Sequence, residues 1–208
     1  MSEKSKITEK EIEEIKKIKG QCRGQTIVTT LQAVLVMEGK EGLAKIESRL
    51  KELNCWPDHF SDFNKNIKVF EWYPLWQDII PSVAVAEVFN WGEEKMKEFG
   101  INNQKVSFFE KILLKYFVSL KLLSKTVTER WSRHYSLGHL ESAEVNEKER
   151  RIVLRLKDFS AHPVFCQLLC GYFQSAASFV VASNVITCQE TKCAFKGDAY
   201  HEFLITWQ

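Results

Sequence analysis

The segment between residues 189 and 203 brings together three side chains that can bind a metal. The stretch QETKCAFKGDAYHEF contains Glu190, Cys193 and His201 around Gly197. If Gly197 is the centre of a hairpin turn, Cys193 and His201 face each other across the strands, with Cβ atoms about 4.5–5.5 Å apart. Glu190 lies three residues before Cys193, an offset that points to the opposite face of a regular strand. Joint ligation therefore requires a bulge or a strong twist between them.

A fourth ligand would come from the helix that precedes the hairpin. Cys166 and Cys170 are four residues apart and share one helix face, so either could reach the hairpin if the helix covers the sheet. Thiolate, imidazole and carboxylate together favour zinc, and four protein ligands would make the site structural. In the alternative interpretation the cysteines are small core residues, as free cysteine usually is, and Glu190 and His201 form a surface pair.

The composition is that of a globular protein. The chain has 208 residues, 45% of them hydrophobic, and a net charge of +2. Its length and hydrophobic content are sufficient to bury a substantial core in one domain over 1–208. The small net charge predicts neither nucleic acid nor an anionic membrane as a partner. The highly charged start, MSEKSKITEKEIEEIKK, is not a signal peptide. We expect a cytoplasmic protein whose cysteines are reduced or bind metal.

An uncharged segment raises the question of a membrane span. Residues 159–189 contain no Asp, Glu, Lys or Arg, and the apolar part is almost long enough to cross a bilayer. Polar residues such as Gln167, Gln174 and Ser178 are spread around this segment. We therefore favour a helix that is buried on nearly all sides over a membrane helix.

The periodicity of the chain changes at Gly138. Helices are expected over 1–138, and one of them begins at the capping box formed by Thr8 and Glu11. After Gly138 the pattern predicts a β-β-α-β-β order, an α+β fold with an antiparallel sheet covered by the buried helix over 139–208. Further helices are expected at 24–39, 41–53, 82–99, 104–123 and 124–137, and strands at 139–145, 151–156, 185–193 and 200–207.

The sequence also contains candidates for a ligand site. Trp131, Tyr135, Phe165 and Leu169 are candidates for an apolar pocket between sheet and helices. The sequence contains neither a phosphate-binding glycine loop nor a dinucleotide fingerprint, and no Ser-His-Asp or Cys-His pairing can be argued from it. We therefore assign no catalytic residue and favour a protein that is not an enzyme.

At these motifs the chain resembles the 4-vinyl-reductase domain family. CQETKCAFKGDAYHEFLITW is similar to the family's closing pattern, and HPVFCQLLCGYFQSAASF is similar to its helix. The resemblance implies a fold shared with vesicle-tethering subunits and a small-molecule-binding module. In phenol-sensing activators such a domain dimerises and holds zinc beside an aromatic pocket. Carried over by position, the ligands are Cys166, Glu190, Cys193 and His201, with Cys170 as the alternative to Cys166 because one gap is a residue longer.

Three functions follow as hypotheses. The first is a sensor or carrier domain that binds a hydrophobic or aromatic molecule beside a structural zinc, as a homodimer with a separate signalling partner. Its mechanism would be a shift between two packings of the helical half. The second is an accessory protein or reductase of tetrapyrrole metabolism, and the third is a protein-interaction subunit without a ligand pocket.

Overall fold

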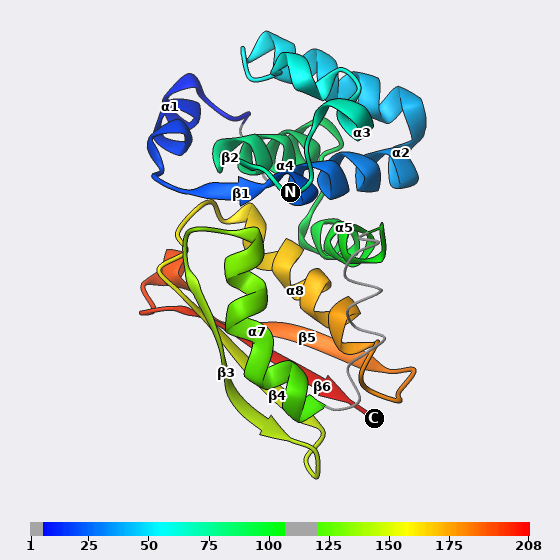
Figure 1. Ribbon diagram of the computed structural model, residues 1–208, viewed down its shortest axis with the longest axis vertical. Coiled ribbons are helices and arrows are strands. Elements are labelled where there is room, and N and C mark those ends of the chain that lie inside the picture. The colour runs from blue at the N-terminus through cyan, green and yellow to red at the C-terminus, as the bar shows by residue number, and fades with distance from the viewer. Residues whose placement is uncertain (1–5, 107–119) are drawn as a thin grey trace.

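Residues 6–106 and 120–208 are described by a computed structural model. As predicted, the fold is α+β, with a helical N-terminal half followed by an antiparallel sheet and its covering helix. The helical layer, the helices α5 (Glu93–Val106) and α8 (Val164–Ala177), and the sheet follow one another along the long axis of the molecule (Figure 1). The site lies where these parts meet.

The N-terminal layer consists of helices and one small antiparallel sheet of two strands, β1 and β2. Its elements are α1 (Glu9–Lys17), β1 (Gln21–Arg23), α2 (Gly24–Glu52), η1 (Asp58–Phe60), α3 (Phe63–Asn66), β2 (Trp72–Pro74) and α4 (Trp76–Val88). The predicted capping box begins α1: the Glu11 N–H donates to the Thr8 hydroxyl at 3.2 Å, and the Thr8 N–H donates to the Glu11 carboxylate at 2.8 Å. Gly39 bends α2 with a φ of +69°, at the boundary where two helices were predicted.

Helix α5 (Glu93–Val106) differs from the prediction of one helix over 82–99. The chain turns between α4 and α5, where Asn90 has a φ of +50°, and α5 continues through Gly100. A Cβ atom on Gly100 would lie 1.9 Å from the carbonyl oxygen of Leu168, and one on Gly171 would lie 1.9 Å from that of Lys97. Gly100 is therefore the crossing point of two helices and not a helix end. Most of the predicted helix over 104–123 lies outside the described residues.

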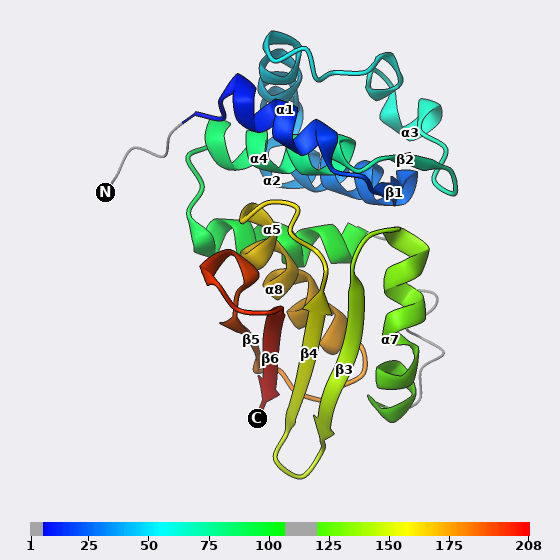
Figure 2. The same cartoon turned by 90° about the vertical axis from the view of Figure 1, so that its left-hand side faces the viewer.

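The sheet has four antiparallel strands in the order β3-β4-β6-β5. Alternate residues of the two central strands are buried, as in Leu154 and Leu156 of β4 and Phe203 and Ile205 of β6, which is the pattern of a sheet with one covered face. Helices α7 and α8 pack along it (Figure 2). The elements of this half are α7 (Leu120–His134), β3 (His139–Asn146), β4 (Arg151–Lys157), α8 (Val164–Ala177), β5 (Ile186–Lys192) and β6 (His201–Trp207).

The apolar part of the uncharged segment forms α8, a helix of 14 residues that is buried along most of its length. It lies between α5 and the sheet, so its apolar faces are covered by protein. Within the described residues, no helix has the length and apolar character needed to cross a membrane.

Candidate ligand pocket and the Cys-Glu-His cluster

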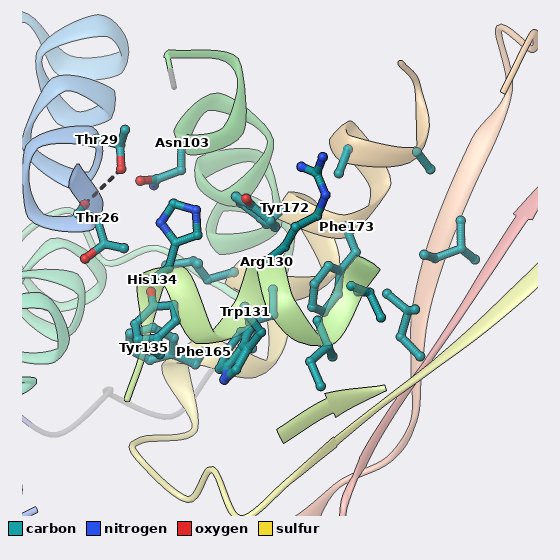
Figure 3. A pocket seen from close by; sticks show the side chains of 18 of the residues that line it. Thr26, Thr29, Asn103, Arg130, Trp131, His134, Tyr135, Phe165, Tyr172 and Phe173 are labelled. Carbon is teal, nitrogen blue, oxygen red and sulfur yellow. Dashed lines mark hydrogen bonds between the residues drawn. The ribbon is translucent and has the colours of Figure 1, made fainter. Parts of the chain in front are cut away.

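A cavity of about 140 Å³ lies between α7, α8 and the covered face of the sheet. Its floor is made of inward-facing strand residues, among them Leu140, Ile152 and Ile205, and its far side reaches α2 and α5. Most of the lining is apolar because each bordering element turns its buried face toward it. Figure 3 shows the cavity with aromatic side chains along α7 and α8 and polar ones toward α2.

Aromatic side chains form one wall of this cavity. Trp131 stacks on Tyr135 with ring centroids 4.7 Å apart, and its indole N–H donates to the carbonyl of Leu137 at 2.9 Å. The hydrogen bond fixes the orientation of the ring. Trp131, Tyr135, Phe165 and Leu169, the residues predicted to form a pocket, all line this cavity. That they contact a ligand stays a prediction.

The polar end of the cavity centres on the carboxylate of Asp78, a residue of α4 that is only 2% exposed. Tyr135 donates its hydroxyl proton to this carboxylate at 2.9 Å, and Thr30 donates to it at 3.1 Å. Asn103 of α5 lies beside them, 3.3 Å from the Thr30 hydroxyl. Burial raises the pKa of Asp78 to about 6, although the two hydroxyl donors and the nearby His134 act in the opposite direction.

This polar end is also where the helical layer joins the rest of the molecule. Tyr135 directly follows α7 and forms a bridge with Cys22 of β1. On either side of it, the Ser136 hydroxyl accepts from the Gln21 N–H at 2.8 Å, and the Arg23 side chain donates to the Arg133 carbonyl at 3.1 Å. The end of α7 is therefore held to β1 by several hydrogen bonds and to α4 through Asp78.

Sequence reasoning missed Asp78, Thr30 and Asn103. The three residues come from α4, α2 and α5, which are distant in sequence, so no spacing rule connects them. One signal was present: Asp78 lies in WQDIIPSVAVAEV, where the other residues near it are mainly apolar. A charged residue inside an apolar helix indicates either a buried polar network or a binding site.

The second cluster contains the four predicted metal ligands. Cys166, Glu190, Cys193 and His201 each place one ligand atom within 4.8 Å of the others. Helix α8 supplies Cys166, and a register shift between Glu190 and Lys192 is the irregularity that joint ligation required. Cys170 lies outside this set and interacts with Cys188, whose hydrogen bond lowers the pKa of the Cys170 thiol. That the four residues bind a metal stays a prediction.

Most of the potential ligand atoms in this cluster already have hydrogen-bond partners within the protein. The His201 Nδ1 lies 2.9 Å from a Glu190 carboxylate oxygen, and its Nε2 lies 3.2 Å from the carbonyl oxygen of Phe159. Both neighbours of the ring are hydrogen-bond acceptors, so the imidazole is held between the Glu190 carboxylate and the Phe159 carbonyl. The sulfur atoms of Cys166 and Cys193 are 3.7 Å apart, and burial, followed by the charge of Glu190, raises the pKa of the Cys166 thiol well above its usual value. A metal ligated by His201 would have to displace one of these hydrogen bonds.

Comparison with known proteins identifies the fold. No family model matches the chain, and no curated protein matches its sequence. An H-NOX protein from S. oneidensis in the Fe(II)NO ligation state is similar over 89% of this chain and 99% of its own, with a TM-score of 0.65 and 16% identity. An oxygen-binding H-NOX domain related to soluble guanylate cyclases covers 89% of this chain and 95% of its own, with a TM-score of 0.61 and 15% identity. The chain therefore shares the H-NOX fold.

Two expectations are corrected by these comparisons. The resemblance to the 4-vinyl-reductase family is wrong, because the similar structures are H-NOX domains. Zinc as the cofactor is also wrong, because the structures that share the fold are described with ligands on iron and, in one case, with haem. Proximity of Cys166, Glu190, Cys193 and His201 does not specify zinc, since their hydrogen bonds account for much of the same arrangement.

Proposed function

We propose that this chain is a sensor domain of the H-NOX fold that binds a small, mainly apolar molecule in the pocket between α7, α8 and the sheet. The observation that carries the proposal is the pocket itself: apolar and aromatic walls with a few polar groups gathered at one end. Ligand sites commonly have this composition. The Ser142 hydroxyl, on the sheet side of the pocket, is buried without a hydrogen-bond partner among the described residues. This hydroxyl could therefore form a hydrogen bond with a bound ligand.

The fold suggests haem as the ligand, but the described residues do not fit a porphyrin. Pockets for drug-sized ligands have volumes of roughly 300–1,000 Å³, whereas this cavity has about 140 Å³. Haem iron is commonly held by a histidine or a cysteine. None of the chain's six cysteines, all of them described, lines this cavity, and of its five histidines only His134 does. The hydroxyl of Tyr135, another residue type that can bind haem iron, donates to Asp78. The buried Asp78 carboxylate would repel the carboxylates of a haem.

A ligand in this pocket could act on the helical layer through the end of α7. Trp131 and Tyr135 lie on the pocket wall, and Tyr135 bonds to Asp78 of α4 and bridges to Cys22 of β1. A ligand that contacts this wall would favour one packing of α7 against the helical layer over another. Such a shift in population is the mechanism that we propose for the sensor.

The pocket also favours a sensor over the pocketless interaction subunit. A separate signalling partner, which would respond to the packing of the helical layer, is part of this proposal. A homodimer stays a prediction from the sequence.

Filling the pocket tests the proposal. Ala176 of α8 lines the cavity, so Ala176→Phe should occupy space that a ligand needs. Ala143 is exposed on β3, and Ala143→Phe is the matched control. A set of single-ring fragments is screened by isothermal titration calorimetry. We expect fragments that bind the unchanged protein and Ala143→Phe but not Ala176→Phe; binding that is equal in all three proteins would refute the pocket as the site.

Hemin distinguishes the haem-based alternative. Equimolar hemin should produce no sharp Soret absorbance band with the unchanged protein, because the cavity is too small and its polar end carries a carboxylate. A stoichiometric band that Ala176→Phe abolishes would show that the pocket opens to accept haem, and the proposal of a smaller ligand would then be wrong.

A further inference from the structure

The carboxylate of Asp78 is a buried charge without a described counter-charge. Its hydrogen-bond donors are the neutral hydroxyls of Tyr135 and Thr30. Among the basic side chains that the structure describes, none forms an ion pair with it. Asp residues are almost never fully buried unless they are paired, because removing the charge from water is costly.

Two basic residues of α7, Arg130 and His134, line the same pocket. His134 lies close enough to lower the pKa of Asp78, but the structure contains no ion pair between the two. The Arg130 side chain donates to the Thr126 hydroxyl at 3.3 Å, and Figure 3 shows it on the side of Tyr172 away from Asn103. Neither residue therefore supplies the neutralising contact at the carboxylate.

The space next to this carboxylate belongs to the ligand pocket. Asp78, Thr30, Asn103 and Tyr135 all line the cavity, and the aromatic wall begins directly beside them with Tyr135 stacked on Trp131. A cation at this end would meet the Asp78 carboxylate, which attracts positive charge, and would lie near aromatic rings, whose faces also attract it. The apolar part of the same molecule would extend toward Phe165 and the sheet.

We propose that the pocket selects molecules that carry a protonated amine on a small apolar or aromatic body, with the Asp78 carboxylate as the counter-charge. The inference rests on the proposed function, since it names the ligand class of the same site. An ammonium group provides three donors, and the carboxylate retains acceptor positions beside those used by Tyr135 and Thr30. An anionic ligand of the same shape would be excluded by repulsion.

The test compares two probes that differ in one group, 2-phenylethylamine and 2-phenylethanol. Calorimetric titration near neutral pH, where the amine is protonated, should give an affinity of the unchanged protein at least about tenfold higher for the amine than for the alcohol. Asp78→Asn should reduce binding of the amine to the level of the alcohol and leave the alcohol nearly unaffected. Asp62→Asn, the same change at an exposed residue that pairs with Lys65, should alter neither.

A pH series on the unchanged protein provides a second test that requires no variant. Binding of an ammonium group needs ionised Asp78, whose pKa is about 6 in the free protein. Affinity for the amine should therefore be constant above this pH and decrease as the pH falls through it, whereas affinity for the alcohol should not follow this profile.

Three results would overturn the inference. They are equal affinity of the unchanged protein for amine and alcohol, amine binding that survives Asp78→Asn, and no binding of either probe. None of them decides the proposed function, which depends on whether fragment binding is lost in Ala176→Phe. A pocket that binds neutral fragments but does not prefer the amine would leave the sensor proposal intact and refute only the ligand class.

Discussion

Asp78→Asn should change how the stability of the protein depends on pH. The pKa of Asp78 is raised from 3.8 to about 6 in the folded protein, and burial is the main cause. Because folding makes ionisation harder, the folded state binds more protons than the unfolded state between these values. The contribution of Asp78 to stability is therefore fully present below pH 3.8 and is lost as the pH rises through about 6.

The size of the effect follows from the shift in pKa. At about 1.36 kcal/mol per pKa unit, the ionised carboxylate costs the folded state roughly 3 kcal/mol at neutral pH. Asn has nearly the same shape but does not ionise, so this cost should be absent from the variant. The free energy of unfolding of Asp78→Asn, relative to the unchanged protein, should thus rise by up to roughly 3 kcal/mol between acidic and neutral pH.

Urea unfolding followed by tryptophan fluorescence measures this difference. The curves should be collected from about pH 4 to pH 8, with Asp62→Asn as the control for an exposed aspartate. The reasoning would be refuted if the difference in free energy of unfolding between Asp78→Asn and the unchanged protein stayed constant over this pH range. It would mean that Asp78 has an ordinary pKa or a positive partner in the folded protein, and the proposed amine site would lose its main physical argument.

Two further variants, each with a matched control, test the helix crossing and the buried pair. Gly171→Ala should destabilise the protein by about 3 kcal/mol, since the added methyl group meets a backbone carbonyl. Gly92→Ala, where the added methyl group meets open space, should cost less than about 1 kcal/mol. Equal losses of stability in thermal unfolding of the two variants would argue against the close crossing of α5 and α8. Glu190→Gln should cost about 2 kcal/mol because it removes the buried carboxylate that is hydrogen-bonded to His201. Glu202→Gln, in a partly exposed pair, should cost at most about 1 kcal/mol, and a similar loss in both variants would contradict the buried pairing.

The sequence predicted the elements whose signals are local. The capping box at Thr8, the bend at Gly39 and the strands after Gly138 depend on residues that are close in the chain, and the structure contains them. The helix predicted over 82–99 was wrong because the chain turns at Asn90 between α4 and α5, and because Gly100, interpreted as a helix stop, lies inside α5. Its actual role depends on contact with α8, more than sixty residues later, which no local pattern contains.

The site was only partly accessible from the sequence. The hairpin arithmetic predicted which residues would lie near Cys193, since strand pairing follows from the position of the turn. The identity of an ion does not follow from proximity, and short cysteine and glutamate motifs occur in more than one fold, so both zinc and the family resemblance were wrong. Asp78 was missed because its partners, Thr30 and Tyr135, are brought to it only by tertiary packing.

The most direct test of the central claim, that the pocket binds a small non-haem molecule, is an NMR titration of the indole N–H signals. The chain has six tryptophans, all within the described residues, and only Trp131 lines the pocket. The Trp131→Phe variant assigns the signal of the Trp131 indole N–H, which donates to the Leu137 carbonyl. A single-ring fragment that binds the unchanged protein should shift this indole peak far more than any other. A fragment that binds and leaves the Trp131 peak in place while shifting another tryptophan, or the failure of every fragment to move it, would contradict the claim.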